Sequence, residues 1–260
     1  MRVEEVINND HCGFGAVVND EVILEYAWGF YASIDRLGVQ VGRFRVDEHG
    51  VVREHEAPIQ FQAYQFDPAV GALALRDSSP SRLPDVYLSV VAEGIRTLGT
   101  KFPGARFEWI GVGTRPFLVD ASFESGQLPK WGGDSRPLSQ GTASAEVYKI
   151  QDLIHLESIW PDHVSVWRNP EFFALVRRTS KAELLPAAPA GDKYIIAAPY
   201  PAAILALLLD HAAGFVFERG SSLCHLAIIL RHHGIPAYVV GDRYKALAAR
   251  TRLRLPDDVA

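Results

Sequence analysis

Residues 218–242, ERGSSLCHLAIILRHHGIPAYVVGD, contain the pattern that decides the fold of the C-terminal part of this 260-residue chain. An apolar run precedes them, a turn of small residues comes next, and an amphipathic run then ends at Gly234 and Pro236. This order predicts a buried strand over residues 214–218, a turn, a helix over residues 222–233 and a strand over residues 236–240. Upstream, residues 193–198 predict a strand and residues 201–210 a helix. Apolar strands alternating with short helices predict an α/β fold whose strands are buried on both faces.

His225 falls in the first turn of the predicted helix. Ser221 or Ser222 is the expected N-cap. The free amides of the first turn, at the positive end of the helix dipole, favour an anion beside the imidazole. A nucleophilic ring nitrogen next to an anion site indicates a phosphohistidine, and Arg219 is placed to contact the phosphoryl oxygens. The alternative reading is a structural histidine at the start of a helix.

Residues 214–242 resemble the swivelling phosphohistidine domain of phosphoenolpyruvate synthase, pyruvate phosphate dikinase and the related antibiotic phosphotransferases. The resemblance extends upstream to about residue 192. It implies a β/β/α domain in which His225 is phosphorylated, Cys224 is its thiol neighbour, and the turn around the phosphoryl group is formed by Arg219, Gly220, Ser221 and Ser222. Two positions depart from the family pattern: Ser221 replaces a glycine and Leu223 replaces a threonine. That threonine is associated with regulation, so we expect no such regulation here.

The N-terminal half predicts an α+β arrangement. Its pattern indicates strands over residues 21–26 and 39–46, a turn at residues 47–50, a returning strand from Val51 and a helix over residues 84–98. Residues 106–112 and 116–121 predict a β-hairpin.

This half resembles the end of the ATP-grasp domain of the same family, through AWGFYASIDRLGVQVGRFRVDEHGVV (residues 27–52) and FEWIGVGTRPFLVDAS (residues 107–122). The resemblance implies that Glu108 is a candidate magnesium ligand; the alternative is an ordinary exposed strand residue. Ala32, Asp120 and Ser122 stand where the family has Glu, Gln and Arg. The family's nucleotide lid and its phosphoenolpyruvate or pyruvate barrel have no counterpart. We therefore expect ATP and Mg²⁺ to bind only with a partner protein that supplies the missing ATP-grasp half, an acceptor domain, or both.

The composition shifts to glycine, serine and proline between residues 124 and 145. The shift predicts a partial ATP-grasp-like domain over residues 1–125, a linker over residues 126–145 and a phosphohistidine domain over residues 146–260. Within the last domain, two short helices are expected between residues 146 and 181. A loop follows over residues 181–192, with a candidate hinge at residues 186–189.

Composition excludes several classes of protein. Apolar residues make up 48% of the chain and charged residues 22%, which is typical of a globular protein. A net charge of -5 provides no positive field for nucleic acid or for an anionic membrane. The two cysteines, Cys12 and Cys224, are far apart, and the N-terminal sequence lacks the pattern of a signal peptide, so we expect a cytoplasmic protein.

Three hypotheses about function follow. In the first, the chain is a component of a phosphotransferase: His225 takes a phosphoryl group from ATP held with a partner and passes it to a small-molecule acceptor. In the second, it is a catalytically inactive scaffold or regulatory remnant of the same family. A third, metal-assisted hydrolysis, rests on Asp10, His11 and Cys12, which are otherwise interpreted as a turn before the first strand.

Overall fold

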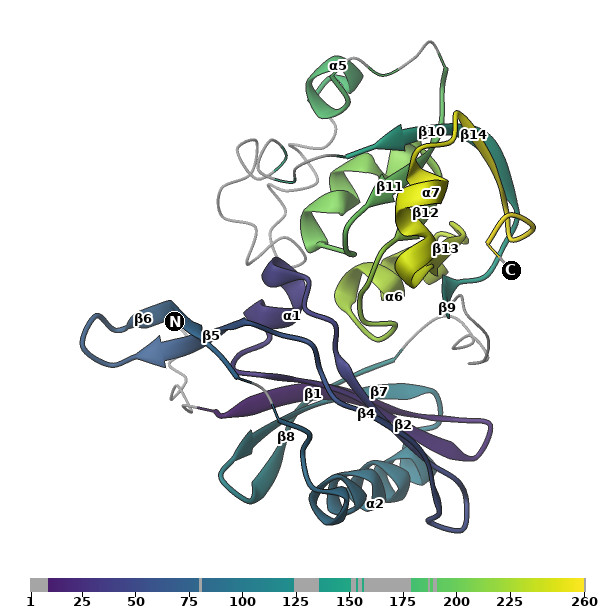
Figure 1. The fold of residues 1–260 in the computed structure, drawn as a ribbon. Helices are drawn as coiled ribbons and strands as arrows, with labels where there is room; N and C mark the ends of the chain where they lie inside the picture. Colours follow the sequence, from purple (N-terminus) through teal and green to yellow (C-terminus); the bar gives the residue numbers. More distant parts are fainter. Residues whose placement is uncertain are drawn as a thin grey trace. The chain divides into compact units, whose positions relative to one another are not determined.

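The computed structural model describes residues 9–79, 81–123, 136–150, 153, 156, 179–186, 188 and 191–259. The chain divides into two compact units, Met1–Glu124 and Ser125–Ala260, and each is described by itself (Figure 1). Both units combine strands with helices, so the predicted α/β class is confirmed.

Unit 1 is built on a six-stranded antiparallel sheet with the order β4-β3-β2-β1-β7-β8. Its strands are β1 (His11–Val18), β2 (Glu21–Trp28), β3 (Gly42–Val46), β4 (Val52–Glu56), β7 (Ala105–Val112) and β8 (Arg115–Phe123). A short helix, α1 (Ala32–Leu37), follows β2, and β5 (Gln62–Asp67) pairs with β6 (Ala72–Asp77) in a separate hairpin. The predicted strand over residues 21–26, the strand returning from Val51 and the hairpin of β7 and β8 are confirmed.

The long helix α2 (Asp85–Lys101) packs on one face of this sheet. Its buried residues, Leu88, Val91, Ala92 and Ile95, follow the helical repeat, which confirms the predicted helix. The helix comes close to β1 because Gly15 has no side chain; a Cβ there would lie 2.1 Å from Cδ1 of Ile95. The sheet contributes four large side chains to this core: Leu24, Phe44, Phe107 and Trp109.

The strand β1, which pairs with both β2 and β7, was not predicted from the sequence. Gly13 and Gly15 weaken the strand pattern of residues 11–18, since glycine carries no side chain that reports which face is buried. Both glycines are required by close neighbours: a Cβ at Gly13 would lie 2.6 Å from the indole of Trp109. The interpretation of residues 10–12 as a turn was therefore wrong for His11 and Cys12, because β1 begins at His11; Asp10 forms a bend before it.

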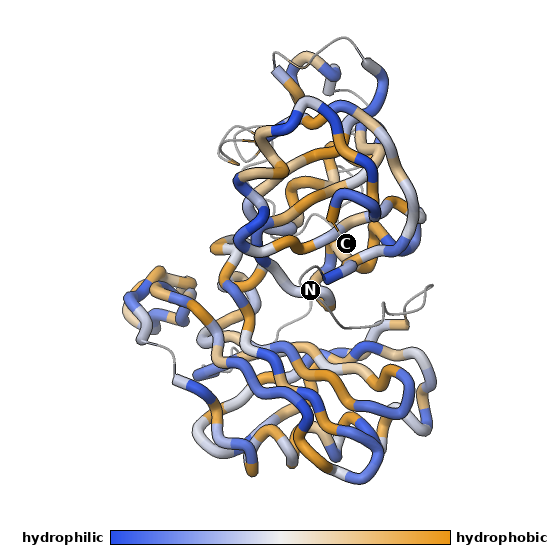
Figure 2. Tube along the Cα trace, turned by 45° about the vertical axis from the view of Figure 1, so that its right-hand side comes forward, coloured by the Kyte–Doolittle hydropathy of each residue, from blue (hydrophilic) through white to orange (hydrophobic). Residues whose placement is uncertain are grey.

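Unit 2 contains a six-stranded sheet with the order β14-β10-β11-β12-β13-β9. The strands β10 (Ala143–Lys149), β11 (Tyr194–Ala198), β12 (Ala212–Phe217) and β13 (Ala237–Val239) run parallel, and β14 (Arg252–Leu255) and β9 (Arg136–Ser139) are antiparallel edges. Between them lie the 3₁₀ helix η2 (Ala203–His211), α6 (His225–His232), the short η3 (Gly241–Arg243) and α7 (Tyr244–Ala248). Every residue of β11 is buried, and Figure 2 shows hydrophobic residues gathered on the inner strands. The predicted buried parallel strands are thus confirmed.

Two segments differ from the expected boundaries. Residues 136–139 and 143–145, expected in the linker, belong to β9 and β10; a four-residue edge strand is too short to show a period. Residues 181–184, expected as loop, form helix α5 (Lys181–Leu184), started by a capping box between Ser180 and Glu183. Residues 126–135, both predicted short helices except Ile150, Leu153 and Leu156, and positions 187 and 189 of the candidate hinge lie outside the described residues. Among the described helices, none has the length and apolar character needed to span a membrane.

Candidate functional site

The predicted site lies where two neighbouring parallel strands of unit 2 end. β11 leads into Pro199–Pro201, and β12 leads into the turn at residues 218–224. The backbone N–H of Arg219 donates to the carbonyl oxygen of Pro199 at 3.2 Å, so the two loops are joined. Ligands of parallel sheets bind at this carboxyl edge, because the loops of adjacent strands converge there.

Gly220 allows these two loops to approach each other. Its φ of +149° is unfavourable for residues with a side chain, and a Cβ would lie 2.3 Å from Cδ of Pro201. Cys224, also buried, places its Sγ 4.0 Å from the carbonyl oxygen of Pro201. Two positions of the turn, Gly220 and Cys224, are therefore packed against Pro201.

The helix after the turn begins at His225, not at Ser222 as expected. Ser221 uses its hydroxyl inside the turn, where Oγ accepts a hydrogen bond from the N–H of Leu223 at 3.1 Å. This serine turn continues the loop, so the expectation that Ser221 or Ser222 is the N-cap is wrong. Cys224 is the N-cap residue, and among the described residues its side chain makes no capping hydrogen bond to the first turn. The first turn of α6 therefore receives no cap from the Cys224 side chain.

His225 is the first residue of α6 and is partly exposed. Leu226, Ala227 and Leu230 anchor the helix in the core, and Gly234 ends it with a φ of +63°, as predicted. The helix thus presents an imidazole at its positive end while the rest of its inner face is buried.

Arg231 links the two ends of α6, a contact that the sequence analysis missed. Its guanidinium donates to the carbonyl oxygen of Ser222 at 2.8 Å and to that of Leu138 on β9 at 2.9 Å. No sequence pattern predicts this contact, because β9 is far away along the chain. Arg231 therefore holds the turn before His225 against the edge of the sheet.

Arg219 lies beside the turn with its side chain 38% exposed. Nη1 is 3.1 Å from a carboxylate oxygen of Glu218, and the guanidinium carbon is 5.9 Å from the ring centroid of Tyr200. A guanidinium held this way at the edge of the site remains accessible to an anion. Its predicted contact with phosphoryl oxygens is compatible with this position.

Glu108, the predicted magnesium ligand, lies on β7 opposite Asp120 of β8 in unit 1. One oxygen of Glu108 accepts a hydrogen bond from Arg106 at 2.6 Å, and Nε of Arg106 is 3.2 Å from the hydroxyl of Ser122. Two carboxylates satisfy Mg²⁺ only when further oxygens, such as those of a phosphate, complete the coordination. We therefore derive no step through a metal from this chain, and the role of Glu108 stays a prediction.

The third hypothesis, a metal site formed by Asp10, His11 and Cys12, is wrong. His11 and Cys12 are successive residues of β1, so their side chains point to opposite faces of the sheet. The described residues contain no group of three or more His, Cys, Asp or Glu side chains that could hold a metal ion.

A known family model matches part of unit 2. Residues 191–249 match the family model described as PEP-utilising enzyme, mobile domain. These residues of unit 2 are thus similar to that mobile domain. No curated protein matches the chain.

The matched mobile domain includes β11, β12, α6 and β13 together with the whole turn before His225. Strands β9, β10 and β14 complete the same sheet but lie outside the matched residues. The resemblance of unit 1 to an ATP-grasp domain stays a prediction.

Proposed function

We propose that His225 is phosphorylated and that the chain carries this phosphoryl group from a donor to an acceptor. The observation that carries the proposal is the position of His225: it is the first residue of α6, at the carboxyl edge of parallel strands, inside the matched mobile domain. A partly exposed imidazole at a helix N-terminus combines a nucleophile with backbone N–H groups that can donate hydrogen bonds to an anion.

In the first step, an unprotonated ring nitrogen of His225 attacks the phosphorus of the donor. A nitrogen–phosphorus bond forms, and the phosphorus–oxygen bond to the leaving group breaks with its electron pair on the leaving oxygen. The amides of the first turn of α6 and the guanidinium of Arg219 stabilise the negative charge on the phosphoryl oxygens. The turn around these phosphoryl oxygens is formed by Gly220, Ser221 and Ser222.

In the second step, an oxygen of the acceptor attacks the same phosphorus. The nitrogen–phosphorus bond breaks, and its electron pair returns to the imidazole. Cys224 has a positioning role in both steps, because its buried side chain packs beside Pro201 and fixes the start of the helix.

In this proposal the donor is ATP, bound with Mg²⁺ on a partner protein that supplies an ATP-grasp half, an acceptor domain, or both. The internal ion pair of Glu108 with Arg106 supports assigning the nucleotide to the partner. The acceptor is a small molecule, and neither nucleic acid nor a membrane takes part. We place the reaction in the cytoplasm.

The test is incubation of the full chain with ATP labelled at the β or γ phosphate and an extract of its source cells. We expect ATP-dependent label that is lost in acid and retained in base, as a phosphohistidine requires. His225→Asn should abolish the label. His232→Asn is the matched control at the other end of the same helix and should retain it. Label that survives in His225→Asn would overturn the proposal.

A second function, that of an inactive scaffold, is favoured by one observation. On unit 1, Arg106 binds both Glu108 and Ser122, so polar groups of the sheet face are satisfied internally. Full biological activity of a His225→Ala variant would support the scaffold over the carrier.

A further inference from the structure

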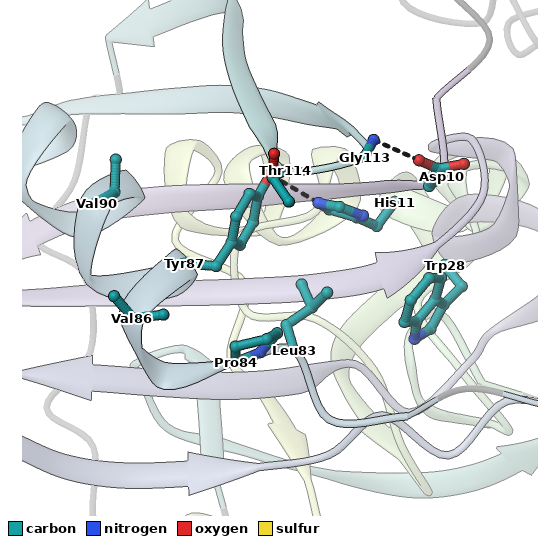
Figure 3. A pocket seen from close by; sticks show the side chains of 10 residues that line it. All are labelled: Asp10, His11, Trp28, Leu83, Pro84, Val86, Tyr87, Val90, Gly113 and Thr114. Carbon is teal, nitrogen blue, oxygen red and sulfur yellow. Dashed lines mark hydrogen bonds between the residues drawn. The ribbon is translucent and has the colours of Figure 1, made fainter.

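Unit 1 contains a cavity of about 560 Å³ near the start of α2, the start of β1 and the end of β2 (Figure 3). This volume is in the range of small-molecule sites. Its walls are mostly apolar and come from Trp28, Leu83, Pro84, Val86, Tyr87 and Val90. The cavity lies within unit 1 and contains none of the residues assigned to phosphoryl transfer.

One wall of the cavity is a buried imidazole that a glycine makes possible. His11 is 2% exposed, and its Nε2 lies 2.7 Å from the hydroxyl oxygen of Tyr87. A Cβ at Gly111 would lie 1.8 Å from that Nε2 and 2.4 Å from the Tyr87 hydroxyl. Only glycine at position 111 therefore allows this pair of polar side chains to lie against β7.

Ring contacts and a hydrogen bond hold the aromatic side chains of the wall. The His11 ring meets Trp28 and Tyr87 edge to face, with centroids 5.7 and 5.1 Å apart. The indole N–H of Trp28 donates to the carbonyl oxygen of Ser81 at 3.1 Å, which fixes the plane of that ring. Rigid aromatic walls lower the entropic cost of binding a flat ligand.

The charge of the walls selects against anions. Burial lowers the pKa of His11 to about 4 and raises the pKa of Tyr87 to about 12, so both are neutral at neutral pH. The residues that line the cavity include Asp10 but no lysine or arginine. One oxygen of Asp10 accepts from the backbone N–H of Gly113 at 2.6 Å, which orients this carboxylate at the cavity.

The walls contain one buried nitrogen without a hydrogen-bond partner among the described residues, and exposed apolar side chains at the rim. Nδ1 of His11 is buried and has no hydrogen-bond partner among the described residues. Val86 and Val90 are 75% and 58% exposed, so water covers apolar surface at the rim. A ligand with an apolar ring and a polar end would cover the valines and pair with the carboxylate of Asp10.

We propose that this cavity binds a small aromatic molecule that carries an amino group and no negative charge. The ring lies among Trp28, Leu83 and the two valines, and the amino group donates to Asp10. The phosphorylated compounds of the proposed reaction are anions, so they are not the ligands of this site. The site is therefore tested separately from the proposed role of His225.

The test uses three probes and the full chain: tryptamine, indole-3-acetate, which has the same ring with a negative charge, and cyclohexylamine, which has the amine without the aromatic ring. Ligand-observed saturation-transfer NMR and titration should show binding of tryptamine and weaker or no binding of the other two. Asp10→Asn should weaken tryptamine about fivefold by removing the charge. Val90→Lys places a cation at the rim and should weaken tryptamine further.

The matched control is Val70→Lys, which changes another valine that is 70% exposed and lies outside the cavity. It should bind tryptamine as the unchanged protein does. The proposal is overturned if tryptamine does not bind up to its solubility limit, if indole-3-acetate or cyclohexylamine binds equally well, or if Val90→Lys and Val70→Lys behave alike.

Discussion

Replacing Gly220 with alanine tests whether the turn before His225 depends on the close approach of two loops. The new Cβ would lie 2.3 Å from Cδ of Pro201, and the φ of +149° would have to be kept. The unfavourable φ costs about 1–2 kcal/mol. Overlap with a proline ring, which cannot rotate away, costs about 1–3 kcal/mol more. We therefore expect Gly220→Ala to destabilise unit 2 by about 2–5 kcal/mol and to slow phosphorylation of His225.

Amide hydrogen exchange in β12 is the suitable assay, because unfolding of a chain with two units is not a single transition. Gly234→Ala is the matched control in the same unit: its φ is +63°, and a Cβ there has no described neighbour within 4 Å. It should cost only about 1–2 kcal/mol, from the unfavourable φ. If both variants lose equal stability, the close approach at Pro201 does not hold the turn, and the reasoning is refuted.

Three further predictions concern the packing of each unit. Gly94→Ala should stabilise unit 1 by about 0.5–1 kcal/mol, because this exposed position lies inside α2 and a Cβ there meets no described atom within 4 Å; exchange in α2 measures it, and a loss of stability would contradict it. Burial lowers the pKa of His11 from 6.5 to about 4, so between these values the unfolded chain binds the additional proton. The free energy of unfolding of unit 1 should fall by up to about 3 kcal/mol as the pH falls from 6.5 to 4; urea unfolding followed by NMR at the amides of β1, at several pH values, should show a flatter dependence for His11→Phe. Arg231→Met removes the hydrogen bonds to Ser222 and Leu138 and should cost about 1–3 kcal/mol and slow phosphorylation of His225, whereas an unchanged phosphorylation rate would show that Arg231 does not position the turn.

The elements with a clear period could be predicted from the sequence. The helix α2 and the buried strands β11 and β12 follow their apolar patterns, and the stop of α6 follows from Gly234. The position of His225 in the first turn of a helix was also predicted. Each of these features follows from the pattern of apolar residues or from the stop signal within its own segment. The local sequence is therefore enough to predict them.

Features that depend on distant partners could not be predicted. β1 lost its pattern because Gly13 and Gly15 make room for Trp109 and Ile95. The helix α6 begins at His225 because the Ser221 hydroxyl accepts a hydrogen bond within the turn instead of capping the helix. The local sequence allows either arrangement. The edge strand β9 is defined by its pairing with β13 and is too short to show a period.

The most direct test of the central claim needs no partner protein. The full chain is treated with phosphoramidate, a small chemical phosphoryl donor, and the intact mass and the modified residue are determined, with His225→Asn in parallel. We predict the gain of one phosphoryl group, located on His225 and absent from the variant. Equal modification of His232 and His233, or an unchanged rate in His225→Asn, would contradict it.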